Sequence, residues 1–173
     1  IDYANSEFKS DILDIYLHTK CYFTATTGTG IDLGSYVSRR PMAWMVVPVG
    51  GFYTFNKNHF FVTKHHKFAN NGAKLPLTEI FESGFAIEVN KINMNKKIIL
   101  EELTPDEISD YLIEVLDILE GKFIWKEENK HIQSLFWNNY KNLTQKYNIS
   151  YLHNNYEAIF SPIHLKNNPQ LLK

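Results

Sequence analysis

The sequence has one cysteine, no long apolar run and no acidic residue in a long central segment. The lone Cys21 lies in an apolar stretch, which excludes a disulfide framework and favours a reducing compartment such as the cytoplasm. No run reaches the roughly 18 apolar residues of a membrane-spanning helix, so we expect no integral membrane segment. The formal net charge is -1 and no basic helix stands out, so we expect no nucleic-acid partner.

The chain also lacks a visible signal peptide and begins with isoleucine rather than methionine. We therefore expect it to be a fragment of a longer protein. At 173 residues and 44% hydrophobic composition it has enough apolar material for one core. Residues 1–173 contain no repeat and no internal linker, so they are predicted to form a single domain.

The acid-free segment runs from Leu33 to Thr78 and concentrates positive charge. Because the whole chain is nearly neutral, this charge is a local feature, and such a segregated patch attracts an anion. The cations and histidines of the segment are Arg39, Arg40, Lys57, Lys64, Lys67, Lys74, His59, His65 and His66.

A turn rich in threonine and glycine precedes this segment. It joins an expected strand over Lys20–Thr24 to an expected helix over Ile31–Ser38. The free N–H groups of such a turn and the helix dipole favour an anion, and glycines allow its close approach. The turn matches neither the dinucleotide fingerprint nor the triphosphate loop, which leaves a phosphate or diphosphate, or a tight turn without a ligand. Its residues are Thr26, Thr27, Gly28, Thr29 and Gly30.

The order of elements predicts the α/β class. Ile1–Ala4 reads as the tail of a strand, and a helix from Ser6 to about His18 carries an inward apolar stripe that includes Ile12 and Ile15. Met42–Val47 is the next strand after the turn and its helix. A β-α-β-α-β order gives a parallel sheet with right-handed crossovers, in which ligands bind at the carboxyl ends of the strands.

The second half of the chain is predicted to be mainly helical. Thr104 and Glu107 form a capping box with proline between them, and an apolar stripe follows until Gly121. The segment from Gly50 to Pro76 has no clear period and predicts a long, partly ordered loop. The other expected elements are a strand at Phe60–Thr63, a helix at Thr78–Phe81, a strand at Phe85–Val89 and a helix at Asn129–Lys146.

Several polar residues have two interpretations. Arg39 and Arg40 either face the helix dipole or contact a phosphate. Glu79 either stabilises a helix start or accepts hydrogen bonds from ribose hydroxyls. His65 and His66 could act on an anionic ligand, whereas adjacent histidines point apart and have no carboxylate nearby in sequence, so we expect no metal site.

Six segments occur in the same order as in a known family. The chain resembles bacterial surface-polysaccharide glycosyltransferases and, more broadly, the C-terminal, donor-binding half of glycosyltransferases with the GT-B fold. The likeness covers nearly the whole chain. The matching segments are Asp2–Ala4, Ser10–Leu17, Thr26–Gly30, Arg40-Pro41, Leu77–Ile80 and Leu103–Ile108.

The resemblance implies a Rossmann-like, three-layer α/β/α domain that binds a nucleotide sugar as substrate, with no cofactor. Thr26–Gly30 would hold the diphosphate, Arg39, Arg40 or Lys64 would neutralise the leaving group without a metal, and Glu79 would bind the ribose. No residue is assigned a catalytic role, because the acceptor and the base would belong to an N-terminal domain that is missing here. We therefore expect this piece to be inactive alone.

The resemblance also bears on location and partners. The full-length protein would be cytoplasmic, with peripheral attachment at the inner membrane left open, and an exposed domain face could support oligomers. Two alternatives stay open: a nucleotide-sugar epimerase half with the same donor site, and a non-catalytic interaction domain with an aromatic partner surface at residues 52–61.

Overall fold

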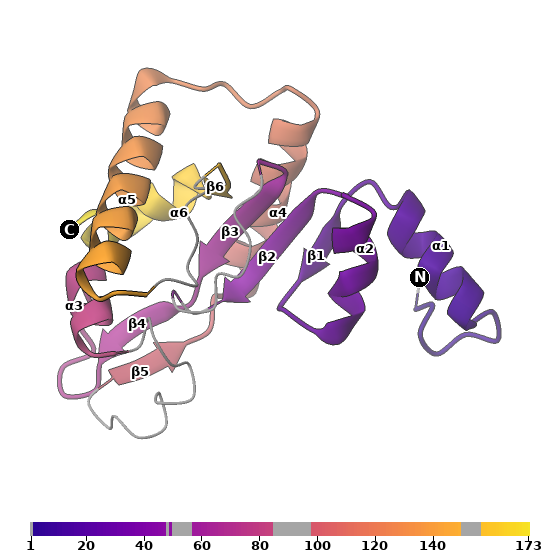
Figure 1. Ribbon diagram of the computed structural model, residues 1–173, viewed down its shortest axis with the longest axis horizontal. Helices are drawn as coiled ribbons and strands as arrows, with labels where there is room; N and C mark the ends of the chain where they lie inside the picture. The colour runs from indigo at the N-terminus through magenta and orange to yellow at the C-terminus, as the bar shows by residue number, and fades with distance from the viewer. Residues whose placement is uncertain (1, 48, 50–56, 85–97, 150–156) are drawn as a thin grey trace.

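The computed structural model describes residues 2–47, 49, 57–84, 98–149 and 157–173. Its centre is a parallel sheet in the order β1-β2-β3-β6, flanked by helices (Figure 1). The sheet contains β1 (Thr24–Thr26), β2 (Met42–Val47), β3 (His59–Thr63) and β6 (Ile159–Phe160). A separate antiparallel pair contains β4 (His65–Phe68) and β5 (Ile98–Glu101).

The helices are distributed around this sheet, with α1 and α2 at one end of the molecule and α5 at the other (Figure 1). Short 3-10 turns lie at Gly30–Asp32 and Pro169–Leu172. The helices are α1 (Asp11–Lys20), α2 (Leu33–Val37), α3 (Leu77–Glu82), α4 (Pro105–Leu119), α5 (Glu127–Lys146) and α6 (Pro162–Asn167).

Successive side chains of the central strands point to opposite faces of the sheet and pack into two hydrophobic cores, one on each face. Phe60 and Val62 pack with Tyr111 of α4. Trp44 and Phe61 point to the opposite face, into the larger core that also receives buried side chains of α3 and α5. Helices therefore cover both faces, and the chain has the mixed α/β architecture expected from its sequence.

Several local predictions are confirmed. Thr104 Oγ1 accepts a hydrogen bond from the Glu107 N–H, and the Glu107 carboxylate accepts one from the Thr104 N–H, which completes the capping box of α4. The strand Met42–Val47 and the strand at Phe60–Thr63 are both present, and α3 lies at the expected short helix. Each of these elements is determined by residues close together in sequence.

The predictions for the N-terminal segment are wrong. Residues 2–9 form turns rather than a strand, and α1 begins after an N-cap at Ser10 instead of Ser6. The apolar stripe of the helix faces solvent instead of a core, with Ile12 81% and Ile15 64% exposed. The reason is position: α1 packs beside α2 at the end of the molecule and does not lie over the sheet (Figure 1).

Two further boundaries differ from the predictions. β1 occupies Thr24–Thr26 rather than Lys20–Thr24, because its register is set by pairing of Thr24 with Met42. Within the segment from Gly50 to Pro76, where we expected one short strand at Phe60–Thr63 and otherwise a loop, the structure also contains β4, which is stabilised by pairing with the distant β5. The expected strand at Phe85–Val89 lies outside the described residues.

Candidate functional site

The turn between β1 and α2 lies open at the carboxyl ends of the parallel strands, as expected for a ligand site in such sheets. Thr26 is buried at the end of β1, whereas residues 27–30 are exposed. Gly28 has φ +91°, a conformation that residues with a side chain rarely adopt. A Cβ atom there would lie 3.6 Å from the Trp44 ring, an ordinary van der Waals distance, so the positive φ rather than a lack of space is what favours glycine.

Hydrogen bonds within the turn already use two of its N–H groups. The Gly28 N–H donates to Thr26 Oγ1 at 3.0 Å, and the Thr29 N–H donates to Asp32 Oδ2 at 2.5 Å. Asp32 is buried at the N-cap of α2, where the helix dipole favours negative charge. The turn therefore holds a carboxylate where we expected a diphosphate to sit.

A hollow of about 500 Å³ opens beside the turn. We call it the Trp44 hollow. Its walls combine the rings of Trp44 and Tyr36 with apolar side chains, while the turn supplies polar backbone and hydroxyl groups. This volume and composition are typical of sites for small organic ligands. The lining residues are Gly28, Thr29, Gly30, Asp32, Leu33, Tyr36, Met42 and Trp44.

Trp44 contributes an indole that is nearly buried but incompletely paired. The Nε1 atom is inaccessible to solvent and has no hydrogen-bond partner among the described residues. The ring stacks on Phe61 with centroids 6.1 Å apart. The packing thus fixes the orientation of this wall of the Trp44 hollow.

The three predicted diphosphate cations do not converge on the turn. Arg40 donates from Nε to the Thr19 carbonyl oxygen at 2.7 Å and so attaches the end of α1. Lys64 forms an ion pair with Glu102. Arg39 follows the C-cap of α2 with φ +55° and is the one of the three that stays exposed.

Glu79 and the histidine pair lie away from the Trp44 hollow. Glu79 is half-buried in the first turn of α3, consistent with the structural interpretation of a helix-start acid. His66 is buried, its Nδ1 lies 3.0 Å from the Lys64 carbonyl oxygen, and burial lowers its pKa to about 4. None of these residues lines the hollow.

His65 belongs to a second cluster, between α4 and α6. Its Nε2 lies 2.9 Å from Glu107 Oε1, and because a carboxylate only accepts, this nitrogen carries the proton. The His65 ring stacks on His164 with centroids 5.7 Å apart. Burial lowers the pKa of His164 to about 3, so this imidazole is neutral at physiological pH.

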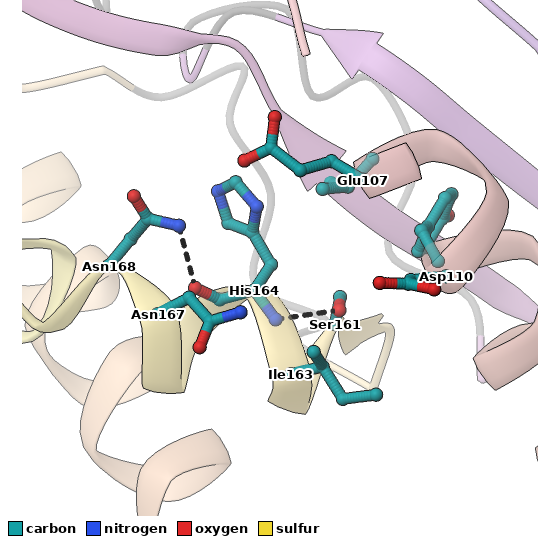
Figure 2. Close-up of a pocket in the computed structure, with 9 residues that line it drawn as sticks. Glu107, Asp110, Ser161, Ile163, His164, Asn167 and Asn168 are labelled. Carbon is teal, nitrogen blue, oxygen red and sulfur yellow. Dashed lines mark hydrogen bonds between the residues drawn. The ribbon is translucent and has the colours of Figure 1, made fainter. Parts of the chain in front are cut away.

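A small pocket of about 30 Å³ adjoins this cluster, enough for one or two water molecules. Figure 2 shows Glu107 and Asp110 on one side, with the His164 ring pointing toward the Glu107 carboxylate. Among the described residues His164 Nε2 has no hydrogen-bond partner. His164 was not predicted to be a site residue, although Ser161 and Pro162 are a recognisable helix start that places it in a first turn.

Glu114 anchors the segment that carries His164. The Ser161 hydroxyl donates to its Oε2, and the Ile163 N–H donates to its Oε1 at 3.0 Å. Burial raises the pKa of Glu114 to about 7. The carboxyl group therefore changes its protonation state near neutral pH while it holds the start of α6.

The described part of the chain contains neither a metal-binding cluster nor a membrane-spanning helix. No group of three or more histidine, cysteine, aspartate or glutamate side chains in this part of the chain is placed to hold a metal ion. No helix in the same residues has the length and apolar character needed to cross a membrane.

The fold and the Trp44 hollow define a mixed α/β protein with an open turn at the carboxyl ends of a parallel sheet. No protein-family model, curated protein or solved structure matches the chain significantly.

Proposed function

We propose that this chain is the donor-binding part of a GT-B glycosyltransferase, which transfers a sugar from a nucleotide sugar to a surface polysaccharide without a metal. The observation that carries the proposal is the Trp44 hollow beside the Gly28 turn, at the sheet edge where α/β proteins bind ligands. The sequence resemblance motivates the choice of ligand, and the volume and lining of the hollow support the proposal that a small organic ligand binds there.

The geometry refines how a nucleotide sugar would be held. The rings of Trp44 and Tyr36 offer apolar surface for a base or a sugar ring. The exposed Thr27 and Thr29 hydroxyls lie where the diphosphate would pass, with Asp32 limiting how deeply it enters. Arg39 is exposed, but it follows the C-cap of α2 at the end of that helix away from the turn, so it is not assigned a contact with the diphosphate.

Calorimetric titration with UDP, GDP and CMP tests the proposal. We expect saturable binding of one nucleotide, and about tenfold weaker binding after Gly28→Val, because the new side chain meets Trp44 and strains the turn. Gly72→Val is the matched control, since Gly72 also has positive φ (+69°) but faces open space. Failure of a folded wild-type chain to bind any of the three nucleotides would overturn the proposal.

Product analysis separates the epimerase alternative from the transferase. A nucleotide sugar incubated with the chain would be isomerised or hydrolysed by an epimerase half. A donor-binding part leaves the nucleotide sugar unchanged in the absence of an acceptor-binding partner. Chromatography of the mixture distinguishes these outcomes.

A non-catalytic interaction domain is a second candidate, and a specific observation favours it. The apolar face of α1 is exposed, as are neighbouring apolar side chains of α2. Exposed apolar patches of this kind often mark protein contact sites. We define the α1 face by Ile12, Ile15 and Tyr16 of the helix, together with the exposed Phe8 of the preceding turn.

A further inference from the structure

One side of α5 carries a continuous stripe of polar and aromatic residues. Their spacing of i, i+3, i+4, i+7, i+8 and i+11 places them on a single helical face. This face lines a shallow hollow of about 540 Å³, which we call the α5 groove. The stripe consists of Lys130, Gln133, Ser134, Trp137, Asn138 and Lys141.

Two indoles give the α5 groove flat apolar surface among its polar groups. Trp137 lies in the middle of the stripe and is only 7% exposed, so packing holds it in place. Trp125 comes from the connection between α4 and α5, is partly exposed and makes an edge contact with Phe123 at 5.0 Å. Rigid aromatic surface flanked by a few hydrogen-bonding groups is typical of a ligand site.

The opposite wall of the α5 groove is the edge strand β6, and one side chain closes part of this edge. The Gln133 amide donates to the Phe160 carbonyl oxygen, and the Phe160 N–H donates to Gln133 Oε1 at 3.1 Å. These are the backbone groups that an added peptide strand would need. Pairing of a peptide with β6 at Phe160 is therefore disfavoured.

The lysines of the stripe are arranged for an extended ligand. Lys130 and Lys141 are eleven residues apart, which corresponds to about 16 Å along the helix. The two side chains therefore start from separate points along the groove. Lys130 is already paired with Glu127 at 2.7 Å, and Glu157 lies on the β6 side, so Lys141 is the main cation of the groove.

We propose that the α5 groove binds a saccharide chain. Sugar rings place their apolar C–H faces against Trp125 and the edge of Trp137, and their hydroxyls bond Ser134 and Asn138. An acidic substituent of the chain pairs with Lys141. This binding needs no nucleotide and is separate from the donor site proposed above, because the groove lies at the β6 edge of the sheet and the Trp44 hollow lies beside β1 and β2.

The test begins with an array of acidic and neutral bacterial glycans, followed by fluorescence titration of the strongest binder. We expect Trp125→Ala to weaken binding about tenfold and Trp125→Phe to restore most of it, because a phenyl ring retains the flat surface. Lys141→Glu should weaken the binding of an acidic glycan about fivefold. Lys20→Glu, the same charge change on exposed α1, is the control and should have no effect.

The outcomes separate this inference from the nucleotide site. Thermal unfolding of each variant checks that the fold is retained. Glycan binding that persists in Gly28→Val and without any nucleotide supports the α5 groove even if no nucleotide binds elsewhere. Absence of binding to every glycan, or equal binding by wild type and by folded Trp125→Ala and Lys141→Glu, overturns the inference.

Discussion

Asp32 Oδ2 accepts a hydrogen bond from the Thr29 N–H at 2.5 Å, so the turn beside the Trp44 hollow contains its own anion. The hydrogen bond stabilises the turn, while the negative charge of the Asp32 carboxylate repels a second anion at the same place. The sequence pattern predicted both a well-formed turn and an anion site. The structure contains the turn, but its own carboxylate opposes the binding of another anion.

Replacing Asp32 with asparagine tests this separation. Asn keeps an acceptor oxygen for the Thr29 N–H but removes the charge, so we expect UDP to bind about fivefold more tightly at low salt. Calorimetry in low and high salt measures the effect, which screening should reduce. Asp14→Asn on α1 is the control, and weaker UDP binding by Asp32→Asn would contradict this account.

The adjacent arginines should behave differently when mutated. Arg40→Met removes the bonds to the Thr19 carbonyl and should lower the free energy of unfolding by about 1–2 kcal/mol without changing UDP affinity. Arg39→Ala should leave both the free energy of unfolding and UDP affinity unchanged, because Arg39 follows the C-cap of α2 and does not line the Trp44 hollow. Urea unfolding and calorimetry measure the two quantities, and a loss of UDP binding in either variant would contradict this assignment.

Glu114 should make stability depend on pH. Its pKa is raised to about 7 in the fold from an ordinary 4.5, so the fold favours the protonated form. The resulting stabilisation is fully present below pH 4.5 and is lost as pH rises to about 7, an effect on the order of 3 kcal/mol.

Glu114→Gln removes this titration and keeps one acceptor oxygen, which can bond the Ile163 N–H, while its NH2 group can donate to the Ser161 hydroxyl oxygen. The unfolding free energy of the variant minus that of the wild type should therefore increase between pH 4.5 and 7.5. Urea unfolding across this range measures the difference. Glu128→Gln, at an exposed position, is the control, and a pH-independent difference for Glu114→Gln would contradict the prediction.

The buried histidines should make the free energy of unfolding rise with pH, which is the opposite of the effect of Glu114. Burial lowers the pKa of His66 to about 4 and of His164 to about 3, so the fold favours their neutral forms. Their stabilisation is present above the ordinary pKa of 6.5 and is lost as pH falls toward these values. We expect the stability of His164→Gln to decrease less than that of the wild type as pH is lowered. Circular dichroism during acid unfolding measures this difference, after the variant is shown to be folded at pH 7.

The α1 face provides a test of the interaction domain. Ile12→Lys with Ile15→Lys should change the unfolding free energy by less than about 0.5 kcal/mol, because both side chains are exposed. If the face is a contact surface between copies, the variant should remain monomeric at concentrations where the wild type associates in sedimentation velocity. Ile113→Lys alters an exposed side chain of α4 and serves as the control. Equal sedimentation of the wild type, the double variant and Ile113→Lys would exclude the α1 face as a contact surface.

Local sequence was sufficient for elements whose determining residues are neighbours. The capping box of α4 satisfies its own backbone donors within four residues, and the apolar run Met42–Val47 suits a strand buried on both faces. The start of α1 was misplaced because Ser6 and Ser10 are equally suitable N-caps, and Tyr3 bonds the backbone of Ser10 in the fold.

By itself, the sequence determined the α/β class, the Gly28 turn and helices α4 and α5, since each depends on short-range spacing and turn chemistry, whereas α6 was not predicted. Only the tertiary structure decided which charges reach the turn. Arg40 is bound to a carbonyl 21 positions away, Lys64 to a carboxylate 38 away and His65 to one 42 away. Such pairings depend on chain topology, because a charged side chain pairs with the opposite charge or dipole that the fold brings within reach.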